Sequence, residues 1–512
     1  MVRTPKEIFN RACFLGVFES SAMTDDFFRN RLDQMIDLRH PLAVLASRMP
    51  WQEIEASLAQ RWARQIKAGR KIEDLDLFGA VSGVADGRIS NAGRPRLPTR
   101  LMVALLYLKH AFNESDEDVI QRWGETPTWQ YFSGNEYFEH RWPCDPTQLG
   151  RFRKALGEEG VEELLARTME VAVNLKLIAR QELARVIVDS TVQEKAVAHP
   201  TDSKLLETAR AKVVQEAKAA GIELKQTYAK EGRELRFKAG RYAHARQFKR
   251  MRKVIKRQRT IVQRLQREVH RKMSTLTQAV QQALGHTLDK AKRLVMQTLS
   301  RKAVDNRAKL YSWHAPEVEC ISKGKSRNPY EFGVKVGLAM TLKGNLIVGA
   351  RSFPGNPYGG HTMHEQIEQS TILMQSLGVK PQVVYADLGY RGVDKDNPGI
   401  EIKHRGKDKR LTNEERRLLK RRQAIEPIIG HLKADHRMDR CHLKGSEGDA
   451  LHAVLCAAGY NIHWLLRMIA KKGLGLLLCL LQARSSVALV AKLAEIIGHH
   501  RLQKTDQRWA LG

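Results

Sequence analysis

The sequence predicts an α/β protein: a mixed-sheet core that is interrupted by a long basic helical insertion and preceded by a helical region. Two apolar runs rich in β-branched residues each lead directly into an aspartate, and two further strand-like runs flank a Gly/Asn turn. Residues 203–300 lack proline and are rich in Ala, Lys, Arg, Gln and Leu, which favours long helices. Before residue 180, apolar residues recur at helical spacing.

These patterns divide the chain of 512 residues into four regions. We expect a helical N-terminal region at 1–180, an α/β core formed by 181–202 and 301–440, the helical insertion at 203–300, and a helical C-terminal region at 441–512. The core is thus discontinuous in sequence, because the insertion separates its first strand from the others.

The charge balance of the chain is strongly basic. The 87 Lys and Arg residues outnumber the 56 Asp and Glu residues, which leaves a net charge of +31. A charge this large repels itself in the compact state, so we expect a polyanionic partner, with nucleic acid first and an anionic membrane surface second. The hydrophobic fraction of 42% excludes a wholly disordered chain. The sequence has no phosphate-binding P-loop, which argues against an ATP-driven motor.

Cysteine usage and hydropathy indicate a cytoplasmic location. The six cysteines are scattered and form no C-x-x-C pair, which argues against a disulfide framework and against a zinc ribbon. Glu7 and Arg11 interrupt the first apolar run, so the N-terminus does not resemble a signal peptide. The most apolar stretch, 473–481, is much shorter than the ~20 residues that span a bilayer. We therefore expect no membrane partner.

The N-terminal region contains a basic segment before a pair of predicted helices. Helices are expected at 102–108 and 116–123, separated by an Asn-Glu-Ser break at 113–115. Gly93-Arg94-Pro95-Arg96 precedes them, and proline disfavours helix in the residue before it. Such extended basic arms can enter the DNA minor groove, here through Arg94 and Arg96. A linker between helices is the other interpretation.

The insertion carries a dense run of one charge sign. Residues 236–272 hold 15 Lys or Arg residues and one acid, while apolar residues recur at near-helical spacing: Met251, Val254, Ile255, Ile261, Val262 and Leu265. This pattern predicts a helical hairpin or coiled-coil arm. Like charges destabilise a bare helix, and a phosphate backbone alongside would neutralise them. We hypothesise that the arm grips DNA or dimerises, with these DNA contacts: Lys249, Arg250, Lys253 and Lys256.

Two aspartates stand out in the core by their context. Asp189 follows the apolar run 183–188, and Asp387 follows a similar run and precedes a glycine-rich turn. A strand interpretation places both carboxylates at the ends of buried strands. Between them, residues 331–353 predict a β-hairpin and residues 361–378 a helix.

A second basic segment spans residues 403–422, and Glu426 follows it closely. In a helix, Arg422 at i−4 and Lys433 at i+7 would share the face of Glu426. An acid flanked by cations can bind a metal and hold a phosphate beside it. Pro427 must kink or restart this helix.

Each of these acids alone has an ordinary explanation, as a helix cap, a turn former or a surface ion pair. Together they predict a sheet that brings Asp189 and Asp387 onto neighbouring strand ends, with Glu426 facing them from a helix. Such an all-oxygen site suits Mg²⁺ or Mn²⁺ rather than zinc. Two hard cations can activate a water or a 3′-hydroxyl and stabilise the leaving oxygen in phosphoryl transfer.

The sequence resembles the bacterial insertion-sequence transposases of the DDE class, which have a ribonuclease-H-like core. The matching motifs are V-I-V-D-S-T at 186–191, A-D-L-G-Y-R-G at 386–392 and R-R-Q-A-I-E-P-I-I-G-H-L-K at 421–433. The family's third-acid signature, Tyr-x2-Arg-x3-Glu-x6-Lys, is matched except at its tyrosine, where this chain has Leu419. The resemblance covers most of 93–133 and 183–435.

The resemblance implies a function and a set of roles. Asp189, Asp387 and Glu426 would be the metal-binding catalytic triad, with Mg²⁺ or Mn²⁺ as two ions. DNA contacts near the cleaved phosphate would come from Arg422 and Lys433, and Arg391 would be a further DNA contact. The protein would cut double-stranded DNA at terminal inverted repeats and join it to a target, as a homodimer or a larger synaptic complex.

Two alternatives remain open at this point. One is a domesticated, non-catalytic nucleic-acid-binding protein, and the other is a related nuclease that cuts without joining. Histidine clusters such as His361 with His364, and His436 with Cys441 and His442, are either transition-metal ligands or surface and DNA-facing histidines.

Overall fold

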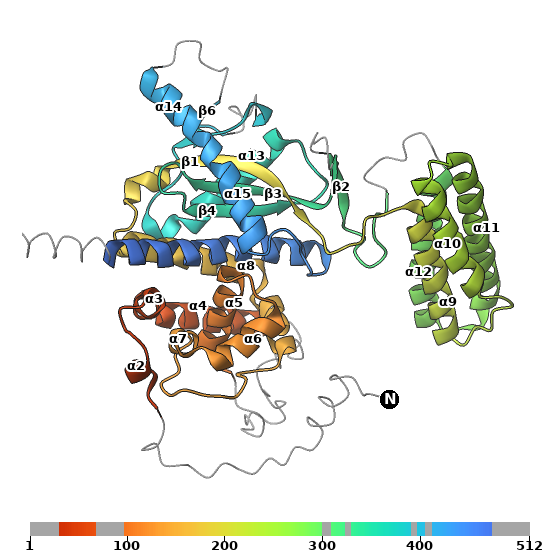
Figure 1. Cartoon of the computed structure of the whole chain (residues 1–512), viewed down its shortest axis with the longest axis horizontal. Coiled ribbons are helices and arrows are strands. Elements are labelled where there is room, and N and C mark those ends of the chain that lie inside the picture. The colour runs from red at the N-terminus through yellow and green to blue at the C-terminus, as the bar shows by residue number, and fades with distance from the viewer. Residues whose placement is uncertain are drawn as a thin grey trace, which may run out of the picture.

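The computed structural model describes residues 30–67, 97–299, 309–322, 329–390, 397–404 and 412–473. A mixed sheet lies at the centre, with a lobe of N-terminal helices below it and a separate helical bundle to its right (Figure 1). The predicted class, an α/β core with a helical insertion and a helical N-terminal region, is confirmed.

The N-terminal lobe is built around one helix that is buried on nearly all sides. This helix, α5, extends from Thr99 to Ala111 and ends before Asn113, which has a positive φ of 61°. Ser115 then caps α6 by accepting a hydrogen bond from the Asp118 backbone N–H. The predicted break at 113–115 is therefore confirmed. The other helices of the lobe are α2 (Leu32–Met35), α3 (Pro41–Arg48), α4 (Trp51–Lys67), α6 (Asp116–Glu125), α7 (Pro127–Phe132) and α8 (Pro146–Asn174).

The central sheet has six strands in a mixed arrangement. The strands follow the order β2-β3-β1-β5-β6, and β4 pairs with β3. β1 is antiparallel to β3 and parallel to β5, so it joins the antiparallel half of the sheet to the parallel half. The predicted hairpin is confirmed as β3 and β4. The strands are β1 (Arg185–Glu194), β2 (Glu319–Ser322), β3 (Tyr330–Thr341), β4 (Ile347–Phe353), β5 (Val383–Tyr385) and β6 (Glu401–Lys403).

The position of Asp189 differs from the sequence prediction. Asp189 lies in the middle of β1, which continues to Glu194, and not at the end of a strand. β1 continues because β3 pairs with it as far as Glu194, while its parallel partner β5 stops opposite Ile187. On the edge of β1 that faced β5, the Ser190 N–H donates to the Asp189 side chain and the Glu194 carbonyl accepts from the Cys441 N–H, so Asp189 lies just past the step where β5 ends.

The insertion is a bundle of four helices, and its middle pair forms a helical hairpin over 229–272, which is one of the two predicted arrangements. The long helices themselves are confirmed as α9 (Asp202–Ala219), α10 (Ala229–His244), α11 (Phe248–Lys272) and α12 (Gln278–Leu299). Positive φ angles at Gly221, Tyr228 and Arg246 mark the turns between α9, α10 and α11. The predicted apolar stripe is buried at Ile261, Val262 and Leu265. The bundle has its own hydrophobic core, separate from that of the sheet.

The remaining helices cover the sheet. They are α13 (Gly359–Leu373), α14 (Asn413–Arg421), α15 (Ile425–Asp435) and a C-terminal helix, Gly445–Gly473. α13 confirms the predicted helix at 361–378 and packs against β3 and β4.

The C-terminal helix belongs to the same core as the sheet and the N-terminal lobe. Its Asn461 side chain accepts from the Ile347 N–H, donates to the Ile347 carbonyl and donates to Thr168 Oγ1. Within the described residues this helix is long and apolar enough to cross a membrane, but 67% of its most apolar stretch is buried inside the molecule, as in a core helix. Most of the apolar stretch 473–481 lies outside the described residues.

Candidate active site

Two aspartates lie side by side at the step where the parallel half of the sheet ends. β1 and β5 pair in register from Arg185 with Val383 to Ile187 with Tyr385. Continued by two residues, the same register places Asp387 opposite Asp189. Residues two apart on a strand point to one face, and neighbouring strands lie about 4.8 Å apart. The register therefore directs both carboxylates to the same face of the sheet.

Arg422 lies between these two carboxylates. Its Nη1 is 3.4 Å from Oδ2 of Asp189, and its Nη2 is 3.7 Å from Oδ1 of Asp387. The Arg422 and Asp189 side chains are only 17% and 21% exposed, whereas that of Asp387 is 56% exposed. Water screens the second contact more than the first. The guanidinium thus occupies the place of a cation shared by two carboxylates.

Glu426 lies on the helical segment that follows Arg422. The helix predicted around it is not continuous: α14 ends at Arg421, residues 422–424 form a 3₁₀ turn, and α15 begins at Ile425. Pro427 lies in the first turn of α15, where its missing N–H interrupts no hydrogen bond of the helix. α15 packs against β1, and Glu426 is exposed one turn after Arg422. The glutamate therefore lies on the segment that carries the bridging arginine.

Lys433 is engaged elsewhere. Its Nζ is 3.8 Å from Oε2 of Glu331, a buried carboxylate on β3. The β3 residue opposite Asp189 is Leu338, which lies seven positions after Glu331. Along a strand this separates Glu331 from Leu338 by roughly 23 Å. The structure thus directs Arg422 to the aspartates and Lys433 toward the far end of β3.

Tyr390 is a site residue that the sequence analysis did not single out. It ends the short turn after Asp387, and its side chain is buried beneath α13. Burial and then the nearby Asp189 carboxylate raise the pKa of Tyr390 well above its usual value, and the Ser190 and Thr362 hydroxyls lie beside the phenol. The A-D-L-G-Y-R-G motif could have indicated this tyrosine. Tyr390 follows Asp387 by three residues, and the short turn between them keeps it close to the end of β5.

A cavity with basic walls opens next to Asp387 and Arg422. Its volume is about 470 Å³. Arg416 and Lys420 of α14 line it together with Leu388, Leu419 and Gln423. Cationic walls beside a pair of carboxylates suit a phosphodiester, whose charge the side chains of α14 would balance.

The donor set fits a hard divalent cation. The two aspartates supply oxygen ligands from adjacent strands, which is the ligand type that Mg²⁺ and Mn²⁺ prefer. A guanidinium already bridges them, which shows that the pair accepts a cation. Arg422 starts a 3₁₀ turn, and its side chain is 17% exposed.

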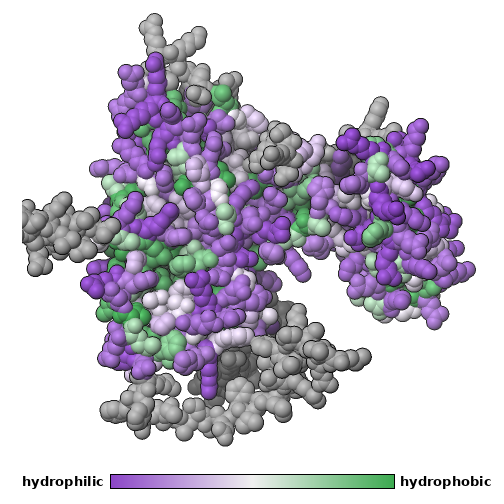
Figure 2. Space-filling view, viewed as in Figure 1, coloured by the Kyte–Doolittle hydropathy of each residue, from purple (hydrophilic) through white to green (hydrophobic). Residues whose placement is uncertain are grey.

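The other predicted DNA contacts fall into two groups. Lys249, Arg250, Lys253 and Lys256 are all exposed on α11, where the spacing of the lysines places them on one face. Figure 2 shows hydrophilic side chains over most of the visible surface of the bundle. None of these four forms an ion pair with a described residue, in contrast to Arg257, which contacts Glu231 at 2.6 Å. Arg94, Arg96 and Arg391 lie outside the described residues.

Comparison with known proteins gives two family matches. Residues 30–155 match the family described as "Transposase domain (DUF772)", and residues 302–462 match the "Transposase DDE domain". The second range contains Asp387 and Glu426, and Asp189 falls between the two ranges.

One curated relative and no solved structure matches. An uncharacterized protein, ORF8 in the nfe locus of Rhizobium meliloti, is 41% identical over 228 residues, which cover 44% of this chain and 97% of the relative.

Proposed function

The chain belongs to the DDE transposases of insertion sequences, and from this membership we propose that it cuts DNA at the ends of its element and joins them to a target. A DDE domain implies a ribonuclease-H-like fold, a DNA substrate and in general a divalent metal. Proteins of this family are generally soluble and cytoplasmic. The cytoplasm as this chain's location, a homodimer or larger synaptic complex as its working form, and both transposon-end and target DNA as partners are part of the proposal.

The observation that carries the proposal is the convergence of Asp189 and Asp387 on one guanidinium. Asp189, Asp387 and Glu426 would hold two Mg²⁺ or Mn²⁺ ions, for which Arg422 would have to release the two aspartates. When bound, the ions supply Lewis-acid activation of a water or 3′-hydroxyl and charge stabilisation for the leaving oxygen. Arg422 lines the basic cavity and would contact the phosphate that is cut.

DNA contacts further from the cut phosphate come from several basic groups. The exposed row on α11 lies on a bundle outside the sheet core, where a duplex can reach it. We assign phosphate-backbone contacts to this row, and further DNA contacts to these residues: Lys433, Arg391, Arg94 and Arg96.

The proposal is tested by assaying a labelled duplex that carries the DNA flanking the gene. The wild-type chain should cut it and join the product to a second duplex only when Mg²⁺ or Mn²⁺ is present. Asp189→Ala, Asp387→Ala and Glu426→Ala should each lower the cleavage rate by about 100-fold or more, while DNA binding persists. Glu414→Gln removes an exposed carboxylate of α14 and serves as the matched control.

Each alternative gives a different pattern. Metal-dependent cutting without joining would assign the chain to the nucleases. Binding without cutting, in the wild type and in every variant, would leave a non-catalytic DNA-binding protein. Full activity in the Asp189 or Asp387 variant would refute the assigned site.

A further inference from the structure

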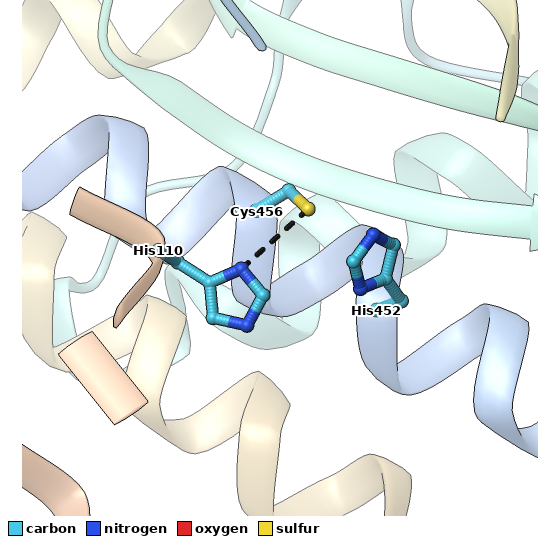
Figure 3. Close-up of side chains that lie close together, drawn as sticks. All are labelled: His110, His452 and Cys456. Carbon is cyan, nitrogen blue, oxygen red and sulfur yellow. Dashed lines mark hydrogen bonds between the residues drawn. The ribbon is translucent and has the colours of Figure 1, made fainter. Parts of the chain in front are cut away.

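A second cluster of ligating side chains lies inside the core, apart from the carboxylates. His110, His452 and Cys456 are all buried, and one potential ligand atom from each lies within 4.8 Å of the others (Figure 3). His110 comes from α5 of the N-terminal lobe, while His452 and Cys456 lie four residues apart on the C-terminal helix. That i, i+4 spacing places both on one helical face.

The local backbone brings the two helices unusually close. Gly459 lies on the same face, one turn after Cys456, and a Cβ atom there would overlap His110. The sulfur of Cys456 is 3.7 Å from Nδ1 of His110, and the dashed line in Figure 3 marks this contact. The cluster therefore lies at the crossing point of the two helices.

The hydrogen bonds of the imidazoles suit ligation. Nε2 of His452 is 2.8 Å from the Arg437 carbonyl, so it carries the proton and leaves Nδ1 with a free electron pair. His110 is fully buried, and its Nε2 has no hydrogen-bond partner among the described residues. Nδ1 of His110 is the ring nitrogen that faces the Cys456 sulfur, so it is the nitrogen that an ion held by this sulfur would take.

We propose that His110, His452 and Cys456 bind a thiophilic transition ion of the zinc class, which fastens the N-terminal lobe to the C-terminal helix. Two imidazoles and a thiolate are the donors that zinc takes, and a water completes its tetrahedron. The thiol proton leaves to solvent when the ion binds. Lys109, Arg153 and Arg437 oppose added positive charge here, but Asp116 accepts from Lys109 and Arg153, and the thiolate offsets one charge of the ion.

The site is distinct from the carboxylate site in donor type and place. The clusters that the sequence suggested do not coincide with it: Nδ1 of His436 contacts the His110 carbonyl at 2.9 Å, and Nδ1 of His364 contacts Asn397 at 3.3 Å. The donors of the proposed site come from segments more than 340 positions apart, and only the fold brings them together.

The test is to purify the full chain without chelators and measure its metal content by mass spectrometry. The wild type should hold an equimolar thiophilic ion, and Co²⁺ exchanged into it should show the absorption of a cobalt–thiolate bond. Cys456→Ser should abolish that absorption and weaken Zn²⁺ binding by about tenfold or more. Cys320→Ser on β2 is the matched cysteine control and should change neither.

Two further variants keep the outcome interpretable if Cys456→Ser folds poorly. His452→Gln should lose the ion while retaining the native circular dichroism spectrum, and Asp387→Asn should retain it, because the carboxylate site is separate. A wild-type protein that holds only trace metal and shows no cobalt–thiolate absorption would overturn the proposal. An equal absorption in Cys456→Ser would overturn it as well.

Discussion

The sheet core and the inserted bundle obtain their stability in different ways. The sheet core gathers side chains from the N-terminal lobe, the strands and the C-terminal helix into one cluster, and it buries polar groups such as His110 and Asn461. The bundle packs four consecutive helices around their own apolar cluster and leaves a basic surface outside. The comparison shows that the candidate active site and much of the positive charge lie in different regions. The paired carboxylates belong to the sheet core, while the basic surface belongs to the inserted bundle, whose helices are consecutive in sequence.

Removing a core side chain from each region tests whether the two cores are independent. Leu106 of α5 and Leu265 of α11 are both fully buried, so Leu106→Ala and Leu265→Ala should each lower local stability by about 2–5 kcal/mol. Hydrogen exchange measured by mass spectrometry should show faster exchange across the sheet and the C-terminal helix only for Leu106→Ala. Faster exchange of β1 or β3 in Leu265→Ala would show that the cores are coupled.

The stability of the sheet core should depend on pH more strongly than that of the bundle. Burial lowers the pKa of His436 to about 4 and that of His452 to about 3, from an ordinary value of 6.5. Below pH 6.5 these histidines are protonated in the unfolded chain but remain neutral in the folded core. The free energy of unfolding therefore falls as the pH falls from 6.5 toward the folded-state pKa values. For His436 the loss reaches roughly 3 kcal/mol once the folded histidine is also protonated.

The histidines of the bundle, His244, His270 and His286, are exposed, so the bundle should retain its helices at a pH where the core has unfolded. Urea titrations at decreasing pH, followed by core tryptophan fluorescence and by helical circular dichroism, measure the two regions. His436→Gln should flatten the dependence of the core transition. A pH-independent core transition in the wild type would contradict the assignment.

The basic surface of the bundle is tested by charge reversal. Changing Lys249, Arg250, Lys253 and Lys256 to glutamate should weaken DNA binding by about 100-fold and make its dependence on salt shallower, because fewer counterions are released. Fluorescence anisotropy over a range of salt concentrations measures both quantities. The control reverses Lys212, Lys218, Lys290 and Lys292 on α9 and α12, which changes the net charge equally. Equal losses in both variants would leave α11 without a specific role.

The smallest expected effect concerns the guanidinium in the candidate active site. Arg422→Gln removes the cation that competes for the aspartates, so Mn²⁺ affinity measured by calorimetry should rise by up to about fivefold, since a partly exposed ion pair contributes at most about 1 kcal/mol. Arg421→Gln is the matched control, because Arg421 contacts the Leu342 and Lys343 carbonyls instead. A lower affinity in Arg422→Gln would mean that the arginine supports ion binding.

Much of the fold could be predicted because local patterns encode it. The hairpin of β3 and β4, the helix α13 and the long helices of the insertion follow from periodicity and turn residues that lie within a few positions of one another. The extent of β1 could not be predicted, since it depends on how far β3 pairs with it. The roles of the candidate acids, the DNA contacts and the division into four regions stay predictions.

By itself, the sequence determined the strand and helix types, the concentration of positive charge and the identity of three notable acids, because these depend on neighbouring residues and on composition. Only the tertiary structure decided that Asp189 and Asp387 share one guanidinium, that Lys433 pairs with Glu331, and that His110 meets Cys456. The physical reason is that strand register and helix crossing join residues hundreds of positions apart, and no local pattern specifies which of them will meet.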